Sequence, residues 1–350
     1  MANAADFKLA GNDEHGIDPP TYGKRTPIMP YINRSFYENE FNRPTKNYFL
    51  AHSARLNFGT YDVKPEKQDM SISTRVRRVN ESGSSIVVTF AYNATVNNNF
   101  NNYGGLEVFW STQNSQSARS RTLSNAVYSA TSQNGYVRGN GVMTLRDIGM
   151  LSSVRIPATL IEAGFMTNFY EAKLMVDPDY QQLIGQLSLK GVCNYLGVPY
   201  YTVEQTNFPT IRNGSRGRSV AYLQFRLLNY GYFLSTDGIF GPATLSAVKK
   251  FQSDNGLAVD GIVGKNTWAK INNLNPSSVT LRRGSRGVET YYLQQKLLSK
   301  LYPVSVDGIF GPATEAQVKA FQSENGLVAD GIVGRNTWAK IIVIGGGRSL

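Results

Sequence analysis

The feature that most constrains this chain is a duplication in its C-terminal part. Residues 235–271 read "STDGIFGPATLSAVKKFQSDNGLAVDGIVGKNTWAKI", and residues 305–341 read "SVDGIFGPATEAQVKAFQSENGLVADGIVGRNTWAKI". The offset is 70 residues, as from Trp268 to Trp338, and the similarity extends upstream through "RNGSRG" and "RRGSRG". Two copies are too few for a solenoid, in which each repeat depends on its neighbours. Each copy is therefore expected to fold as a small domain of its own.

Each copy has the pattern of three helices joined by two glycine-rich turns. Apolar residues of the first copy fall on single helix faces, namely Leu223, Leu227 and Leu228, then Ala247, Val248 and Phe251, then Thr267, Trp268 and Ile271. In each "DGI" turn, Asp accepts a backbone hydrogen bond and Gly takes a positive φ. Pro242 fits the first turn of the middle helix. We interpret Trp268 and Trp338 as core residues rather than ligand platforms, because their helix neighbours are apolar.

Length and charge divide the chain further. Its 350 residues suffice for two or three domains, which we place at residues 1–200, 207–274 and 280–342. The net charge is +11, and +9 of it lies from Asn207 onward, where 17 basic residues accompany 8 acidic ones. This excess suggests an anionic partner, such as nucleic acid, lipid or an acidic wall polymer, with scattered charge that serves solubility alone as the alternative. No groove-reading motif accompanies the charge, so nucleic acid ranks lower.

The sequence shows no pattern of a membrane span or a secretory signal, and its single cysteine does not suggest a reactive site. No run of about eighteen apolar residues occurs, so membrane insertion is not expected. The N-terminal "MANAADFKLAGNDEHG" lacks the basic and apolar regions of a secretory signal, so we expect synthesis in a cytoplasm and release by another route. The lone Cys193 lies beside Val192 and Leu196 and is interpreted as a core thiol.

Residues 1 to about 200 alternate between strand and helix patterns, which predicts an α/β sheet layered with helices. We expect strands in "DFKLAGN", "IVVTFAY", "GGLEVFWS" and "RIPATLIEAGF". We expect helices in "EFNRPTKNYFLAHSARLN", "RTLSNAVYSATSQ" and "DPDYQQLIGQLSLKGVCNYLGV". Asp177 caps the last of these helices, and Pro178 opens it. The apolar run from Ile86 to Phe90 predicts a strand buried on both faces, and the run ends in the small and polar residues "AYNA" from Ala91 to Ala94.

Few side chains of this domain suggest chemistry. The chain has only two histidines: His15 follows the first strand, whereas His52 lies mid-helix and is interpreted as structural. Glu162 ends an apolar strand, where burial would raise its pKa and suit acid–base work, although capping or an ion pair is the alternative. Glu38 and Glu40 begin a helix, where acidic residues also compensate the helix dipole.

Two resemblances connect these pieces. "DGIFGPAT…VKAFQ…NGL…DGIVGRNTWAKI" resembles, in both copies, the three-helix peptidoglycan-binding repeat of bacterial and phage wall hydrolases. The order of the N-terminal motifs resembles the zinc-dependent N-acetylmuramoyl-L-alanine amidases of the amidase-3 type, including those of phage endolysins. The segments that carry this resemblance, over most of residues 7–197, are "HGIDPPTYGKRTP", "YENEFNR", "GGLEVFWS", "VRGNGVMTLRDIGML" and "LIEAGFMTNFYEAKLMVDPDYQQLIGQLSLKGVCNYL".

The amidase resemblance implies a Zn²⁺ held by His, Glu and His, with a fourth position open for water, whose pKa the metal lowers. It makes His15 the first ligand. Glu38 becomes the second ligand, because the family places its Glu four residues before the helix Asn, here Asn42. Glu40 is the fallback if that register slips.

The same resemblance assigns roles around the metal. Glu162 is the implied general base and acid, which shuttles protons while the amide bond breaks. Asn93 and Arg138 are the implied substrate contacts. The first motif departs from the family, which has Asp-x-Gly-His-Gly where this chain has "NDEHG", and whether Asp13 or Glu14 assists stays open.

The third ligand position departs more seriously. The family's strand motif reads Ser-Ile-His-x-Asn-Ala, and here it reads "TFAYNA", so the histidine falls on Ala91. Losing one of three ligands is expected to weaken zinc binding and to slow or abolish cleavage. A natural change and an engineered His-to-Ala change both remain open.

Three hypotheses follow. The first is a peptidoglycan hydrolase that cleaves the amide between N-acetylmuramic acid and L-alanine, anchored to peptidoglycan and its anionic polymers by the two repeats. The second is a catalytically inactive peptidoglycan-binding protein. The third is a basic binding protein of another class. For release we expect holin-assisted phage lysis, mother-cell lysis or loading into a phage-tail-like particle.

Overall fold

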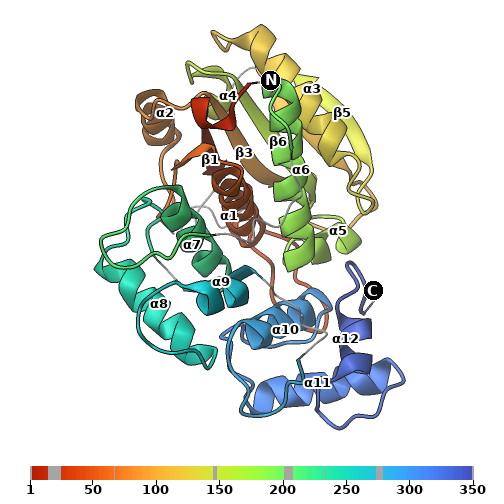
Figure 1. Cartoon of the computed structure of the whole chain (residues 1–350). Helices are drawn as coiled ribbons and strands as arrows, with labels where there is room; N and C mark the ends of the chain where they lie inside the picture. Colours follow the sequence, from red (N-terminus) through yellow and green to blue (C-terminus); the bar gives the residue numbers. More distant parts are fainter. Residues whose placement is uncertain are drawn as a thin grey trace.

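An α/β domain forms the N-terminal part of the protein, and two helical units follow it in the lower part of Figure 1. The expected fold class, a sheet layered with helices and followed by two small three-helix domains, is confirmed. The computed structural model describes residues 2–14, 25–66, 68–144, 148–200, 208–232, 234–272 and 279–348. Among these residues, no helix combines the length and apolar character needed to cross a bilayer.

The sheet of the first domain has the strand order β2-β1-β3-β6-β4-β5. Strands β2, β1, β3 and β6 are parallel, whereas β4 runs antiparallel to β6 and parallel to β5. The C-terminal ends of β1, β3 and β6 therefore share one sheet edge with the N-terminal ends of β4 and β5. The strands are β1 (Lys8–Asp13), β2 (Gly59–Asp62), β3 (Ile86–Asn93), β4 (Leu106–Trp110), β5 (Gly139–Thr144) and β6 (Ala158–Phe165).

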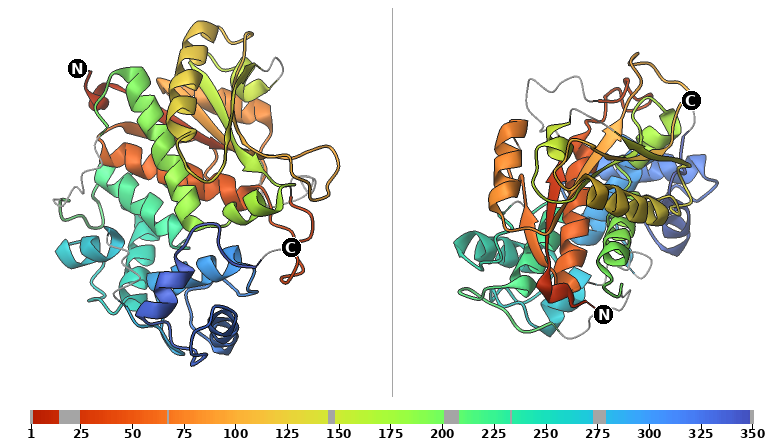
Figure 2. Two further views of the ribbon diagram at one scale, coloured as in Figure 1. Left: turned by 90° about the vertical axis from the view of Figure 1, so that its right-hand side faces the viewer. Right: turned by 90° about the horizontal axis from the view of Figure 1, so that it is seen from above.

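Helices cover both faces of the sheet, as the view from above in Figure 2 shows. One face carries α1 (Asn39–Arg55), α3 (Ser117–Thr131) and α6 (Pro178–Leu196), and the other carries α2 (Ile72–Glu81) and α4 (Gly149–Ser152). A short η1 (Ala4–Asp6) precedes β1, and α5 (Phe169–Leu174) follows β6.

Strand β3 is buried on both faces, as its apolar run predicts. Phe90 and Tyr92 belong to the core beneath α1 and α6, while Val87 and Ala91 belong to the smaller core beneath α2 and α4. A central strand of a parallel sheet loses water from both sides, so apolar side chains are favoured at successive positions. Because side chains alternate along β3, Ala91 lies on the face beneath α2 and α4, and Tyr92 lies on the face beneath α1 and α6.

Every strand and helix expected from the sequence is present, and Asp177 caps α6 by accepting a hydrogen bond from Asp179 N at 3.1 Å. The patterns missed β2, α2 and β5, and also the short η1, α4 and α5. Strands β2 and β5 are the two edges of the sheet and contain no fully buried residue, so neither shows an apolar run. Helix α2 carries Ile72, Val76 and Val79 at helical spacing, an apolar stripe that the sequence analysis overlooked.

The helical units have the predicted three helices each. These are α7 (Arg218–Asn229), α8 (Pro242–Asp254) and α9 (Lys265–Asn272) in the first unit, and α10 (Val288–Ser299), α11 (Pro312–Glu324) and α12 (Arg335–Ile341) in the second. Both tryptophans are core residues, as predicted, with Trp268 4 % and Trp338 0 % exposed. Their indole N–H groups donate to the carbonyls of Pro209 and Val279 at 2.9 and 2.7 Å.

A buried glutamine braces each glycine-rich turn, a device that the sequence pattern did not reveal. In the second unit, Gln294 Nε2 donates to Asp307 Oδ1 at 2.8 Å and to Thr314 Oγ1 at 3.1 Å, and its Oε1 accepts from Gly308 N at 2.8 Å. Buried polar groups satisfied on all sides fix a local conformation. The other three turns use Gln224, Gln252 and Gln322 in the same way.

Both units pack on the first domain. Helix α7 lies along α1, and α10 meets the start of α6. There, the fully buried Lys296 donates from Nζ to both carboxylate oxygens of Asp177, at 2.9 and 2.8 Å, and to Asp179 Oδ2 at 3.0 Å. The hydroxyl of Tyr292 also donates to Asp179, at 2.8 Å. A buried cation thus joins the second unit to the cap of α6.

The C-terminal segment returns to the first domain as well. The Arg348 guanidinium lies over the rings of Tyr302 and Tyr31, at 4.2 and 4.8 Å, and pairs with Glu324. Lys173 Nζ donates to the Arg348 carbonyl at 3.1 Å. The second unit therefore contacts the first domain at more than one place.

Candidate active site

Neighbouring strand ends bring Ala91, Glu162 and Glu107 into one row. Ala91 of β3 pairs with Glu162 of β6, and Glu162 pairs with Glu107 of β4. Direct partners across a sheet point to the same face, so a carboxylate stands beside the Ala91 methyl group. Oε2 of Glu162 is buried. The row lies at the edge where α/β domains bind their ligands, outside the carboxyl ends of the parallel strands.

Glu38, the residue immediately before α1, contacts the same strand end. It is 2 % exposed, and its Oε1 accepts hydrogen bonds from Tyr92 N at 3.1 Å and Asn42 Nδ2 at 3.0 Å. The spacing of four residues to Asn42, on which its assignment depended, therefore corresponds to a direct contact. Its carboxylate lies against the residue that follows Ala91.

Glu40, the fallback ligand, is engaged elsewhere. Its two oxygens accept from the Arg34 guanidinium at 2.8 and 3.1 Å, and Oε2 also accepts from Tyr37 N at 2.8 Å. A bidentate guanidinium–carboxylate pair fixes both partners in orientation. Of the two acidic residues, Glu38 is therefore the better candidate for the second metal ligand.

Asn93 and Glu107 form a polar link across the site edge. Asn93 Nδ2 donates to Glu107 Oε2 at 3.0 Å, and Asn140 Nδ2 donates to Glu107 Oε1 at 3.3 Å. Asn93, one of the two expected substrate contacts, is therefore held by a carboxylate of the row. Glu107 was not singled out from the sequence, although a charged residue within the apolar "LEVFW" is the same signal that pointed to Glu162.

Arg138, the other expected substrate contact, is exposed and precedes β5. It lies near Glu171, a second residue that the sequence did not reveal. Burial raises the pKa of the Glu171 carboxyl, while hydrogen bonds from Phe165 N and Gly105 N and the Arg138 guanidinium oppose that rise. These bonds, at 2.7 and 3.2 Å, join the end of β6 to the segment before β4.

The glycine after Glu162 and Ala163 has a packing reason. A Cβ at Gly164 would come within 2.5 Å of the Tyr92 hydroxyl oxygen. That hydroxyl donates to the Glu171 carbonyl at 2.7 Å, so the ring cannot easily give way. The "EAGF" motif thus combines a strand-end carboxylate with the close approach of β3 to β6.

His15, the expected first ligand, lies outside the described residues, but the strand leading to it is firmly held. Asp13 at the end of β1 is fully buried, and although burial alone would raise the pKa of its carboxyl, Lys46, Lys64 and Arg43 bring that pKa below its usual range. Their nitrogens lie 3.0, 3.6 and 3.4 Å from its oxygens. Asp13 is therefore engaged in an ion cluster.

The remaining candidate residues are structural, as expected. His52 is buried, its Nε2 lies 3.0 Å from Gln186 Nε2, and burial together with Arg55 lowers its pKa. The Cys193 thiol is buried, which raises its pKa to about 12, far from the range of a reactive thiolate.

The described residues fit a zinc ion only in part. Among them, no group of three His, Cys, Asp or Glu side chains is placed to hold a metal ion. Glu38 supplies one carboxylate, and position 91, where the sequence analysis expected the third ligand, carries only a methyl group. A set of three protein ligands is thus not complete in the part of the chain that the structure describes.

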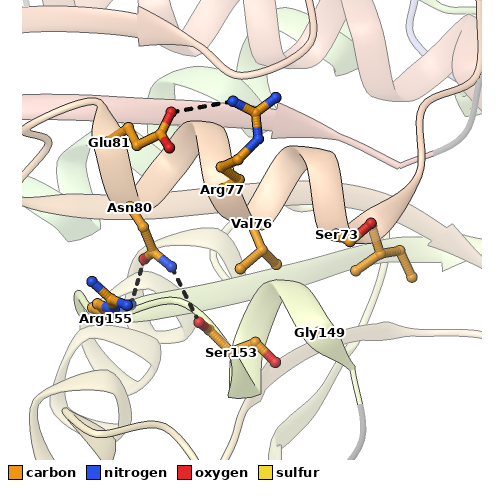
Figure 3. Close-up of a pocket in the computed structure, with 9 residues that line it drawn as sticks. Ser73, Val76, Arg77, Asn80, Glu81, Gly149, Ser153 and Arg155 are labelled. Carbon is orange, nitrogen blue, oxygen red and sulfur yellow. Dashed lines mark hydrogen bonds and ion pairs between the residues drawn. The ribbon is translucent and has the colours of Figure 1, made fainter.

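A cleft separate from this site lies between α2 and α4 (Figure 3). Its volume is about 520 Å³. Asn80 links its two walls, donating to the Ser153 carbonyl at 3.4 Å and accepting from Arg155 N at 2.8 Å, while Arg77 pairs with Glu81 at 3.4 Å. The strand-end residues described above do not line it, so it is a different surface.

Comparison with known families assigns a class to each part. Residues 21–194 match the N-acetylmuramoyl-L-alanine amidase family, and residues 216–271 and 286–341 each match a putative peptidoglycan binding domain. The chain therefore contains an N-acetylmuramoyl-L-alanine amidase-family domain, followed by two peptidoglycan-binding repeats. Both resemblances seen in the sequence are thereby confirmed. The domain limits of 1–200, 207–274 and 280–342 stay predictions.

Individual relatives cover parts of the chain. The N-acetylmuramoyl-L-alanine amidase CwlL of Bacillus licheniformis is 32 % identical over an alignment of 160 residues, and the match covers 37 % of this chain and 44 % of that protein. The zinc D-Ala-D-Ala carboxypeptidase of Streptomyces albus G is 47 % identical over 74 residues, 20 % of this chain and 29 % of that protein. The chain thus spans less than half the length of these two curated relatives.

Among solved structures, an N-acetylmuramoyl-L-alanine amidase from Clostridium difficile 630 is similar, with 24 % identity and a TM-score of 0.47. The match covers 56 % of this chain and 98 % of that one. The amidase AmiC2 of Nostoc punctiforme has 18 % identity and a TM-score of 0.46, over 54 % of this chain and 97 % of its own.

Proposed function

We propose that this protein is a peptidoglycan hydrolase that cleaves the amide between N-acetylmuramic acid and L-alanine and is retained on the wall by its two repeats. The observation that carries the proposal is the convergence of Glu38 and Glu162 on the end of β3 within an amidase-family domain. Two carboxylates from different elements at one strand end are suited to ligand and proton-transfer roles.

Glu162 is the proposed acid–base group. It takes a proton from the attacking water and returns it to the leaving amine of L-alanine, so that one carboxyl group serves both halves of the reaction. Its pairing with position 91 supports this role, because it lies beside the place where the third ligand would stand. Asn93 and Arg138, at the same edge, are proposed to contact substrate.

His15 and Glu38 are the proposed protein ligands of Zn²⁺, and the third position is the weak point. A methyl group at Ala91 cannot donate an electron pair, so we propose that this chain binds zinc poorly and is impaired as a hydrolase. A site with only two protein ligands binds zinc more weakly, because zinc affinity depends on the number and geometry of the ligands.

The repeats are proposed to bind peptidoglycan and its anionic polymers. The +9 charge of residues 207–350 supports attraction to acidic wall polymers, and two modules in one chain raise retention through effective concentration. We propose that the protein, like an endolysin, reaches the wall after lysis, by holin-type release or by particle loading.

The decisive experiment compares the parent chain with Ala91→His. We expect the variant to gain about one zinc ion per chain after dialysis and to hydrolyse purified murein, as measured by new lactyl carboxyl and L-alanine amino groups. Ala94→His, which adds an exposed imidazole three residues along, is the control and should gain neither. If Ala91→His restores neither metal nor activity, the site assignment is wrong.

The alternative is a catalytically inactive peptidoglycan-binding protein, and the same methyl group is the observation that favours it. In that case the parent chain pellets with purified walls at low salt while releasing no amino groups. Equal zinc loading of the parent and Ala91→His would instead mean that another residue replaces the missing ligand.

A further inference from the structure

The two repeats meet at a defined junction. Asn255, just after α8, accepts a hydrogen bond from Val288 N at the start of α10, at 3.2 Å. Lys270 pairs with Glu289 at 2.6 Å, and the Glu289 side chain is 6 % exposed. The Tyr291 ring lies against the backbone of the first repeat, since a Cβ on Gly231 would come within 2.7 Å of the ring. The repeats are therefore fixed relative to each other.

A cleft of about 250 Å³ opens at this junction. Residues of both repeats line it, so the cleft exists only where the two repeats are packed together. The lining residues that matter here are Tyr232, Lys250 and Asp254 from the first repeat and Arg286 and Tyr291 from the second.

The acidic side chain of the first wall is already neutralised. Asp254 Oδ2 accepts from the Tyr232 hydroxyl at 2.9 Å and from Lys250 Nζ at 2.8 Å. The second repeat has an equivalent pair, in which the Tyr302 hydroxyl donates to Glu324 at 2.7 Å. There the cation is Arg348, which covers the Tyr302 ring. In both repeats the chain's own cation thus satisfies this carboxylate, so a cationic ligand would have to displace it.

The charged groups of the second wall differ from each other. Asp307 is used by its own turn, because Oδ1 accepts from Ile309 N and from Gln294 Nε2, each at 2.8 Å. Arg286 is exposed, and no described residue forms an ion pair or hydrogen bond with its guanidinium. The cleft therefore presents to a ligand a guanidinium among tyrosine rings.

We propose that this junction cleft binds the peptide stem of peptidoglycan, with a stem carboxylate on Arg286 and apolar stem side chains against the tyrosine rings. The inference rests on the proposed wall-binding function and adds the site and the part of the polymer that is bound. A guanidinium pairs with a carboxylate through two parallel hydrogen bonds. In uncleaved peptidoglycan the ionised carboxylates are on the peptide, because the lactyl carboxyl of muramic acid is consumed in the amide bond.

The test is calorimetric titration of the full chain with a soluble stem peptide that carries free carboxylates. Arg286→Gln should weaken binding about tenfold, the range expected for a charged hydrogen-bond pair, and Arg286→Lys should keep part of the affinity. The matched control is Arg216→Gln. Arg216 is the same position in the first repeat, makes the same backbone bridge and does not line the cleft, so this variant should bind within about twofold of the parent.

A peptide-free disaccharide of N-acetylglucosamine and N-acetylmuramic acid, with its free lactyl carboxylate, is titrated in parallel. If the disaccharide binds and the stem does not, the stem assignment is overturned and the lactyl group is the ligand. Equal losses in Arg286→Gln and Arg216→Gln would show general charge attraction and overturn the site. A chain that pellets with walls but shows no Arg286 effect overturns the cleft alone, whereas failure to pellet contradicts wall retention itself.

Discussion

Ala91 and Glu162 are direct partners across β3 and β6, so a methyl group occupies the position beside a strand-end carboxylate with a buried oxygen. Ala91 is 2 % exposed and contributes to the core beneath α2 and α4. An imidazole introduced there would emerge next to the proposed acid–base group, at the rim of that core. This relationship makes the role of Glu162 testable through position 91.

In the Ala91→His background, Glu162→Gln should lower kcat by about 10²–10⁴-fold, the usual contribution of a general acid–base group. Zinc content should stay the same, because Glu162 is not a proposed ligand. The measurement is the rate of amino-group release from murein, together with zinc by atomic absorption. Loss of zinc in parallel with activity would mean that Glu162 binds the metal.

Glu38 and Glu40 give opposite predictions for metal binding. In the same background, Glu38→Ala should weaken zinc affinity by at least about 100-fold. This exceeds the loss typical when a residue that only hydrogen-bonds to a metal ligand is replaced. Glu40→Ala should leave zinc affinity within a few-fold, since Glu40 is paired with Arg34. Competition with a chromogenic chelator measures both. The reverse ranking would shift the ligand register by two residues.

The buried Lys296 should matter strongly for stability. Lys296→Met leaves the Asp177 carboxylate buried without its cation, and removal of one member of a buried pair costs about 3–5 kcal/mol. Adding Asp177→Asn should recover part of this loss, because Asn is also a good helix N-cap. Urea unfolding of the single and double variants gives the coupling energy. Additive losses would show that the pair contributes no interaction of its own.

Lys300 predicts a pH dependence of stability above neutrality. Burial, with Lys296 adding repulsion, lowers the pKa of Lys300 from 10.5 to about 8. Between these values the unfolded chain binds more protons, so the free energy of unfolding rises with pH, by roughly 1 kcal/mol from pH 8 to 9 for this one group.

Lys300→Met removes that rise, so the stability difference between the parent and Lys300→Met should change by this amount over the same range. Lys340→Met, at an exposed position, should run parallel to the parent. Urea unfolding at pH 7, 8 and 9 measures all three chains. Parallel curves for Lys300→Met and the parent would show that Lys300 does not titrate there.

Periodicity predicted the elements that bury a clear face, such as β3, α6 and the helices of both repeats. It could not predict β2 and β5, because edge strands expose much of their surface and show no apolar run. The bracing glutamines were also missed, since a polar residue on a helix normally faces solvent. Each is buried only because a turn folds back on it.

At the candidate site, the sequence predicted a contact within one segment but not the contacts between segments that lie far apart in the chain. The four-residue interval from Glu38 to Asn42 corresponds to a hydrogen bond. Glu107 stands in the row only because β4 runs antiparallel to β6, a pairing with no local sequence signal. Lys296 meets Asp177 across 119 residues of chain, which no periodic pattern encodes.

The contact between Lys296 and Asp177 means that the repeats cannot be removed without altering the amidase-family domain. A chain cut before the repeats would leave the cap of α6 facing water with its charge unmatched and the flank of α1 uncovered. The amidase-family domain of such a truncated chain differs from the same domain in the intact protein, so loss of wall attachment would not be the only effect of the cut. Replacement of the repeats by others would likewise change groups that pack on the amidase-family domain, and a second repeat without a cation at this position of α10 would leave Asp177 unmatched.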